Sequence, residues 1–167
     1  MKPFGRFSAG TFLLVFLTYI FYTGSATGYD VITGTLVALV VSLLVGRWVV
    51  EDDRKVFQPR RWLSAIIFFL RYFVVEETRT HVDVAKRVFT LRTRPGIVRI
   101  PLDVKSDYAR VLVANSITNT PGTVVVDITD DGKYLYVHWI DVSSLDEGEI
   151  KRNVVSYFED YAGRMFD

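Results

Sequence analysis

Two long apolar segments lie within the first fifty residues. Val31 to Val50 has twenty residues and a single charge, Arg47, near its end. Phe7 to Tyr22 has sixteen residues and no charge. As helices they would be about 30 Å and 24 Å long, against a hydrocarbon core of about 30 Å. Both segments therefore predict membrane-spanning helices.

The loop and the surrounding charges predict the topology of these helices. Gly24 to Asp30 is short and contains Gly and Ser, so the helices should form an antiparallel hairpin. Basic residues lie before and after the hairpin and none lies in its loop: Lys2, Arg6, Arg47, Arg54, Lys55, Arg60 and Arg61. Because such residues favour the cytoplasmic side, both ends should be cytoplasmic. A cleaved signal peptide ending at Gly24-Ser25-Ala26 is the alternative for the first segment, but the second segment disfavours it.

A third apolar segment, Trp62 to Val75, is shorter and contains Arg71. Its fourteen residues would form a helix of about 21 Å, and a full span would place a strongly basic segment outside. We therefore expect a helix in the membrane interface, with Arg71 reaching water. A third full span is the alternative. The segment continues with an amphipathic spacing of three and four residues at Val75, Thr78, Val82, Ala85 and Phe89.

The C-terminal part reads as a small α/β domain. The expected elements are a strand over Ile97–Val104, a helix over Asp107–Ser116 capped by Ser106, strands over Thr123–Thr129 and Tyr134–Asp141, and a last helix that presents Ile150, Val154, Phe158 and Tyr161 after a capping box of Ser144 with Glu147. This β-α-β-β-α order predicts a three-stranded sheet with helices on one side, a fragment of the ferredoxin-like pattern.

The predicted fold is thus a membrane α-helical hairpin plus a small cytoplasmic α/β domain. We expect three parts: a transmembrane hairpin over residues 1–58, an amphipathic interfacial helix over residues 59–94 and the α/β domain over residues 95–167.

The second apolar segment carries small residues at a strict four-residue spacing: Gly34, Ala38, Ser42 and Gly46. Small side chains allow the backbones of two membrane helices to approach closely. The stripe is therefore expected to be a helix-packing face or a contact with a partner. Chance spacing of common small residues is the alternative.

The segment from Asn115 to Gly122 has two interpretations. Pro121 and Gly122 suit a turn before a strand. Ile117, Thr118 and Thr120 are less well explained by a turn, because an apolar residue between hydroxyls suits a loop that docks against another subunit. Candidate docking residues are therefore Asn115, Ile117, Thr118, Thr120, Pro121 and Gly122.

Residues that could carry chemistry are few. The chain has no cysteine and only two histidines, so we expect no metal site, and no glycine spacing matches a nucleotide fingerprint. We expect no cofactor and no catalytic residue. A net charge of +1 disfavours nucleic-acid binding. Glu51-Asp52-Asp53 is expected to be a solvated loop beside a membrane helix.

One longer run gives a resemblance. Residues 115–123 read Asn-Ser-Ile-Thr-Asn-Thr-Pro-Gly-Thr, and Asp127 and Val137-His138-Trp139-Ile140 follow. Together with the hairpin, the third apolar segment, the His81–Lys86 stretch and the α/β domain, this run resembles the E subunit of the Mrp-type multisubunit sodium/proton antiporters over essentially the whole chain.

The resemblance implies a non-catalytic accessory subunit in the cell membrane, with other membrane subunits as partners. The complex would be an Mrp antiporter or an antiporter-derived respiratory complex such as a membrane-bound hydrogenase. A free-standing, membrane-tethered sensory domain for a small ligand is the alternative. It would need a polar pocket, of which the sequence gives no sign.

Overall fold

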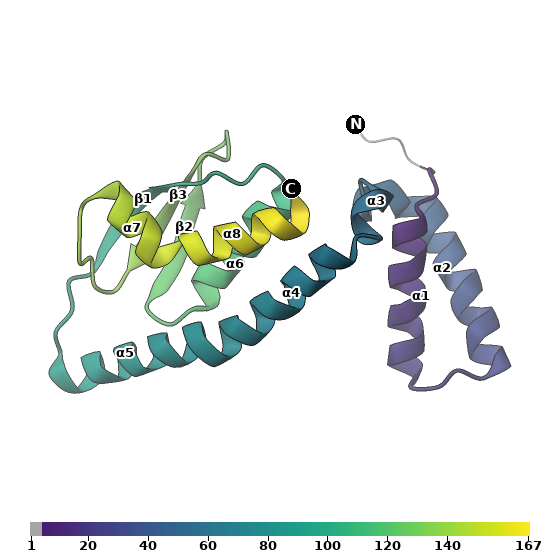
Figure 1. Cartoon of the computed structure of the whole chain (residues 1–167), viewed down its shortest axis with the longest axis horizontal. Helices are drawn as coiled ribbons and strands as arrows, with labels where there is room; N and C mark the ends of the chain where they lie inside the picture. The colour runs from purple at the N-terminus through teal and green to yellow at the C-terminus, as the bar shows by residue number, and fades with distance from the viewer. Residues whose placement is uncertain (1–4) are drawn as a thin grey trace. The chain divides into compact units, whose positions relative to one another are not determined.

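The structure is a computed structural model that describes residues 5–167 (Figure 1). Residues 1–4, including Lys2 of the charge argument, lie outside the described residues. The chain divides into two compact units, which we call the hairpin unit, ending at Pro59, and the α/β unit, Arg60–Asp167.

The hairpin unit consists of α1 (Ala9–Thr23), α2 (Gly28–Val49) and the short α3 (Asp53–Val56). α1 and α2 lie side by side, joined by one short loop (Figure 1). Gly24 ends α1 in the left-handed conformation, and Thr27 begins α2 with a capping box to Asp30. Among the described residues, α2 is the one helix long and apolar enough to cross a membrane, and only 17% of its most apolar stretch is buried. It is therefore not the core helix of a water-soluble fold.

A continuous helical segment opens the α/β unit. α4 (Pro59–Arg71), the π-turn η1 (Tyr72–Glu76) and α5 (Glu77–Thr90) follow without interruption, and we call them together the long helix. The residues expected as an interfacial helix, 59–94, are therefore helical as far as Thr90, and from Arg60 on they belong to the α/β unit.

The π-turn keeps one side of the long helix facing the rest of the unit. Tyr72 and Thr80 are eight residues apart, which in an uninterrupted α-helix would place them about 80° apart around the axis. Absorbing one extra residue in the π-turn reduces this angle to about 20°. The buried side of α4 thus continues into the half-buried Thr80, Val84 and Arg87 of α5.

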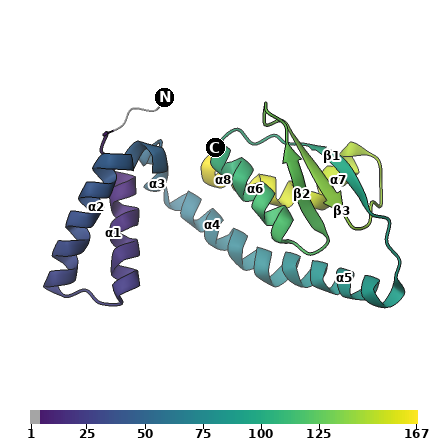
Figure 2. The ribbon, with the colours of Figure 1, turned by 180° about the vertical axis from the view of Figure 1, so that it is seen from behind.

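The sheet has three strands, β1 (Gly96–Pro101), β2 (Thr123–Ile128) and β3 (Tyr134–Trp139), in the antiparallel order β1-β3-β2. Figure 2 shows β3 between β1 and β2. Alternate residues of β1 and β3 are buried, so one face of the sheet packs on the core and the other carries exposed side chains such as Ile97 and Arg99. β2 has an irregularity between Val125 and Asp127.

Helices α6 (Asp107–Asn119), α7 (Glu147–Val154) and α8 (Ser156–Phe166) complete the unit. The core is formed by Val98, Ile100, Val113, Ile117, Leu135, Val137, Ile150, Phe158 and neighbours from α4 and η1. Three local predictions were wrong. The expected single last helix is divided into α7 and α8 at Val155. α6 extends three residues beyond Ser116, and Asp146 rather than Ser144 caps α7, because its carboxylate accepts the amide of Glu149.

Candidate functional site

The small-residue stripe of α2 packs against α1. Gly34, Ala38, Ser42 and Gly46 are the buried residues of α2. A Cβ atom at Gly34 would lie 2.8 Å from the ring of Tyr19. The stripe is therefore a helix-packing face inside this chain. The expectation that it also contacts a partner does not fit, since α1 and the residues before it cover the stripe.

Hydrogen bonds reinforce this packing at the end of the hairpin where α1 begins. The Ser42 hydroxyl donates to the carbonyl of Ser8 at 2.6 Å and accepts the amide of Ser8 at 3.1 Å. The Thr11 hydroxyl donates to the carbonyl of Gly46 at 2.7 Å. All three hydroxyl-bearing residues are buried, so each bond forms where little water competes.

Asp53 caps α1 from a distant part of the sequence. Its carboxylate accepts the Ser8 hydroxyl at 2.5 Å and the Gly10 amide at 2.9 Å, and Arg47 lies 3.3 Å away. Burial raises the pKa of this carboxyl, but the hydrogen bonds and the guanidinium together hold the pKa below its ordinary value. The solvated-loop prediction was therefore wrong for Asp53. The sequence contained a signal for this contact. α1 has no acidic residue in its own first turn, so a carboxylate from elsewhere in the chain can stabilise the N-terminus of this helix.

Two residues of the predicted docking segment are buried inside the α/β unit. Ile117 is fully buried in the core and lies on α6 rather than on a loop, so its assignment as a docking residue was wrong. Thr120 is also buried, and its hydroxyl donates to the carbonyl of Ser116 at 2.7 Å. Asn115 and Thr118 are exposed, but Thr118 accepts the amide of Val125 on the edge of the sheet.

Pro121 and Gly122 form the turn into β2. Gly122 has a φ of +93°, which disfavours any residue with a Cβ atom. A Cβ atom there would also lie 3.0 Å from Ile140. Local geometry thus accounts for Gly122 without any partner subunit.

Asn119 gives the same segment a second role, which the sequence did not reveal. Its side-chain amide donates to the Tyr72 hydroxyl at 2.9 Å, so the end of α6 is tied to the π-turn of the long helix. The pairing joins residues 47 positions apart and has no local pattern in the sequence.

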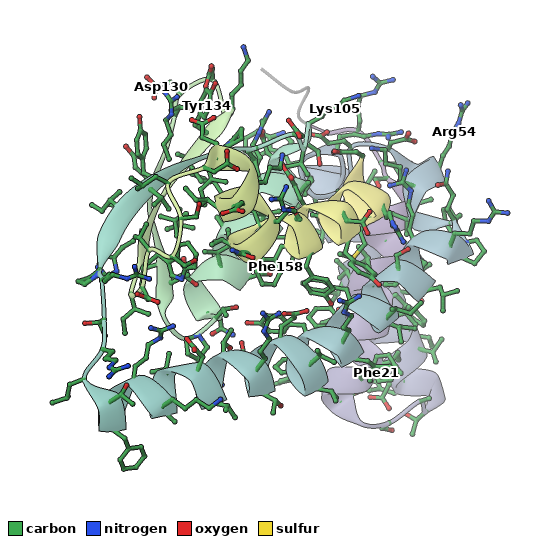
Figure 3. All side chains as sticks on the ribbon, turned by 60° about the vertical axis from the view of Figure 1, so that its left-hand side comes forward. Phe21, Arg54, Lys105, Asp130, Tyr134 and Phe158 are labelled. Carbon is green, nitrogen blue, oxygen red and sulfur yellow. The ribbon has the colours of Figure 1, made fainter. Side chains whose placement is uncertain are left out.

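An aromatic cluster holds the long helix against α8. The ring of Phe68 lies 5.8 Å from Tyr72, 5.7 Å from Tyr157 and 6.5 Å from Phe158. Figure 3 shows Phe158 on the side of α8 that faces the long helix. The Tyr157 hydroxyl donates to the carbonyl of Phe68 at 2.9 Å, and burial raises the pKa of Tyr157 to about 12.

A second anchor lies near the far end of the long helix. Asp141, just after β3, pairs with Arg87 of α5 at 2.9 Å and with Arg94 at 3.1 Å. The hydrogen bond from Arg94 and the charge of both arginines hold the pKa of Asp141 below its usual range.

Within residues 5–167, no group of three or more His, Cys, Asp or Glu could hold a metal ion.

Residues 12–165 match the family model described as Na+/H+ ion antiporter subunit. The chain belongs to this antiporter-subunit family. The resemblance drawn from its sequence is confirmed.

Relatives within the family match along most of their length. The chain is 32% identical over 137 residues to the E subunit of the Na(+)/H(+) antiporter of Alkalihalophilus pseudofirmus, covering 81% of this chain and 84% of that one. It is 36% identical over 143 residues to the E1 subunit of the Na(+)/H(+) antiporter of Staphylococcus haemolyticus, covering 81% and 83%. A chain of the membrane-bound sulfane sulfur reductase, an archaeal respiratory membrane complex, is 29% identical, with a TM-score of 0.79 over 93% of this chain and 96% of that chain.

Proposed function

We propose that this chain is a non-catalytic accessory subunit of a multisubunit cation/proton antiporter module, in an Mrp antiporter or in an antiporter-derived respiratory complex. The observation that carries the proposal is the match of residues 12–165, which takes in most of the hairpin and nearly all of the α/β unit, to an antiporter-subunit family. The alternative of a free-standing sensory domain has no support among the relatives.

The residues of the hairpin favour a structural role over an ion path. Ion-translocating helices keep ionisable side chains at central membrane depth. α1 has none, and α2 has only Asp30 in its first turn and Arg47 in its last. Asp30 is moreover engaged by the hydroxyls of Ser25 and Thr27. Ions would therefore pass through partner subunits.

Both α1 and α2 are proposed to cross the membrane, which makes the chain multi-pass with both ends of the hairpin and the α/β unit in the cytoplasm. The basic residues at the end where α1 begins and α2 ends support this orientation. Because the chain has no native cysteine, Ser25→Cys in the loop and Ser106→Cys in the α/β unit can be labelled singly. An impermeant thiol reagent added to intact cells should label Ser25→Cys alone. Labelling of Ser106→Cys from outside would exclude the orientation.

The α/β unit is proposed to be a ferredoxin-like fragment. Its elements run β1, α6, β2, β3 and then two helices, and its strand order is β1-β3-β2 with both pairings antiparallel. A βαββαβ unit that lacks its last strand would have this order.

Purification in a mild detergent tests the accessory role. A tagged chain extracted from its native membrane should migrate at a mass many times its own 19.1 kDa. Mass spectrometry of the co-purifying subunits would then distinguish an antiporter from a respiratory complex. Recovery of only a monomer or dimer from fresh membranes would contradict the proposal.

A further inference from the structure

The long helix is buried along one side only. Phe68 and Tyr72 are 1% and 4% exposed against α8, and farther along Arg87 pairs with Asp141 at 2.9 Å. The α/β unit therefore covers this inner side at both α4 and α5. A segment covered by a polar-surfaced domain cannot be surrounded by lipid. This packing argues against the alternative in which Trp62–Val75 forms a third full span.

The opposite side is apolar and is not covered by the rest of the α/β unit. Along about 39 Å of helix, large side chains repeat outward with helical spacing. Their exposed fractions range from 47% to 88%, at Leu63, Ile66, Leu70, Val74, Val82 and Phe89. We call these residues the outer stripe. An apolar stripe of this length exceeds the scattered surface apolar residues of a soluble domain, so it indicates a binding surface.

The charges of the long helix favour an anionic partner. Residues 59–90 contain six arginines and lysines against three acids. Glu76 and Glu77 are turned inward, with side chains 18% and 15% exposed, and Asp83 lies in an ion pair on the same helix. Arg79 and Lys86 are exposed beside the outer stripe. The uncovered side thus combines apolar and basic groups, as do helices that lie in an anionic lipid interface.

Chain connectivity keeps the start of the long helix near the end of the hairpin. α3 ends at Val56 and α4 begins at Pro59, so their ends can be at most about 11 Å apart. α3 itself is fixed to the start of α1 through Asp53. Because the hairpin is proposed to lie in the bilayer, the bilayer is within reach of the long helix.

We propose that the long helix lies along the membrane surface, with its outer stripe in the acyl–headgroup boundary of an anionic bilayer and the α/β unit on its inner side. That this surface is the cytoplasmic one rests on the topology proposed above. Because the proposed occupant of the outer stripe is the bilayer and not a partner subunit, the placement can be tested on the chain alone.

Spin labels on single cysteines test the placement in the full chain, reconstituted alone in vesicles rich in phosphatidylglycerol. Labels at Leu63→Cys, Leu70→Cys, Val74→Cys and Val82→Cys should collide more with oxygen than with a polar nickel chelate. A label at Val111→Cys, an exposed apolar position of α6, is the matched control and should show the reverse.

Label depths separate a surface helix from a spanning one. On a surface helix the labels at Leu63→Cys and Val74→Cys should lie at nearly the same depth. On a spanning helix their depths would differ by about 16 Å, because the positions are eleven residues apart. That difference would overturn the proposal. Free collision of these labels with the nickel chelate, or protection from both reagents by a protein contact, would overturn it equally.

A charge-reversed variant tests the role of the anionic lipid. Arg79→Glu combined with Lys86→Glu should reduce the oxygen preference of the Val82→Cys label several-fold, while the Leu70→Cys label keeps its preference. A preference unchanged at both positions would overturn the electrostatic part of the proposal.

Discussion

In the hairpin unit most buried residues are small, whereas in the α/β unit most buried residues are large. α2 turns Gly34 and Ser42 inward and leaves Leu36 and Leu44 more than half exposed. In the α/β unit the buried residues are of the opposite kind, namely Ile100, Leu135, Val137, Phe158 and their neighbours. Burial in the hairpin therefore follows the closeness of two backbones, and burial in the α/β unit follows the removal of apolar area from water.

The difference reflects the solvent proposed for each unit. Lipid is as apolar as leucine, so helices in a bilayer gain from close contact and hydrogen bonds rather than from hiding large side chains. The long helix has features of both units, since Phe68 is buried on its inner side while Leu70 is 62% exposed on the other. An element with two apolar sides of this kind is expected where a water-facing domain meets a membrane.

The largest expected effect comes from a charge placed in the apolar core of the α/β unit. Ile117→Asp puts a carboxylate at a position with no exposed surface, which should cost about 5 kcal/mol or more of unfolding free energy. Limited proteolysis of the full chain in detergent should then cleave the α/β unit while the hairpin stays intact.

The matched control for Ile117→Asp is Val111→Asp on the same helix, where the parent side chain is 55% exposed. It should change stability by no more than about 0.5 kcal/mol. Equal protease sensitivity of the two variants would show that Ile117 is not a core residue.

Ile117 also shows what sequence reasoning could predict and where it failed. The turn at Pro121 and Gly122 was predictable, because each residue has a local conformational preference. The predicted end of the preceding helix at Ser116 was three residues too early. That error moved Ile117 from a helix face to a loop, and a buried residue was interpreted as a docking residue.

The second prediction concerns the aromatic cluster between the long helix and α8. Phe68→Ala should lower the unfolding free energy of the α/β unit by about 3–5 kcal/mol, because the cavity left among Tyr72, Tyr157 and Phe158 has no side chain to fill it. Chemical denaturation of the full chain in detergent measures this loss. Leu70→Ala, on the outer stripe, should cost far less in the same detergent. A similar loss of unfolding free energy in both variants would contradict the description of the long helix as buried at Phe68 and uncovered at Leu70.

The third prediction tests the small-residue packing of the hairpin. Gly46→Ala would place a Cβ atom 2.9 Å from the carbonyl oxygen of Arg6 and from the amide of Ser8. Backbone atoms cannot rotate away, so helix separation should become easier by about 1–3 kcal/mol. A dye pair on α1 and α2, followed during titration with a denaturing detergent, measures the separation.

Gly28→Ala is the control, because no atom lies within 4 Å of the position its Cβ would take. This variant should separate at the same detergent concentration as the parent. If Gly46→Ala does so as well, the stripe does not determine how closely α1 and α2 approach.

In the hairpin unit, helix packing could be predicted from the sequence, but the hydrogen bonds of Ser8, Ser42 and Asp53 could not. The four-residue spacing on α2 was visible in the sequence, since helical geometry alone places those residues on one side. The bond between Ser8 and Asp53 joins residues 45 positions apart, and it depends on how α3 folds back on the start of α1. No periodicity encodes such a contact, so a structural carboxylate was interpreted as a solvated one.

The smallest expected effect is the pH dependence of this contact. Because the pKa of Asp53 in the folded hairpin lies below its ordinary value, the ionised carboxylate stabilises the hairpin. The contribution is fully present above the unfolded pKa, and it is lost as the pH falls through the lower folded pKa. Helix separation, measured with the same dye pair, should therefore become easier in the parent as the pH falls below about 4. Asp53→Asn should be weaker than the parent at pH 7 and should show less of this acid dependence. An acid response of equal size in both proteins would assign the effect to another carboxylate of the hairpin unit, such as Asp30 at the opposite end of α2.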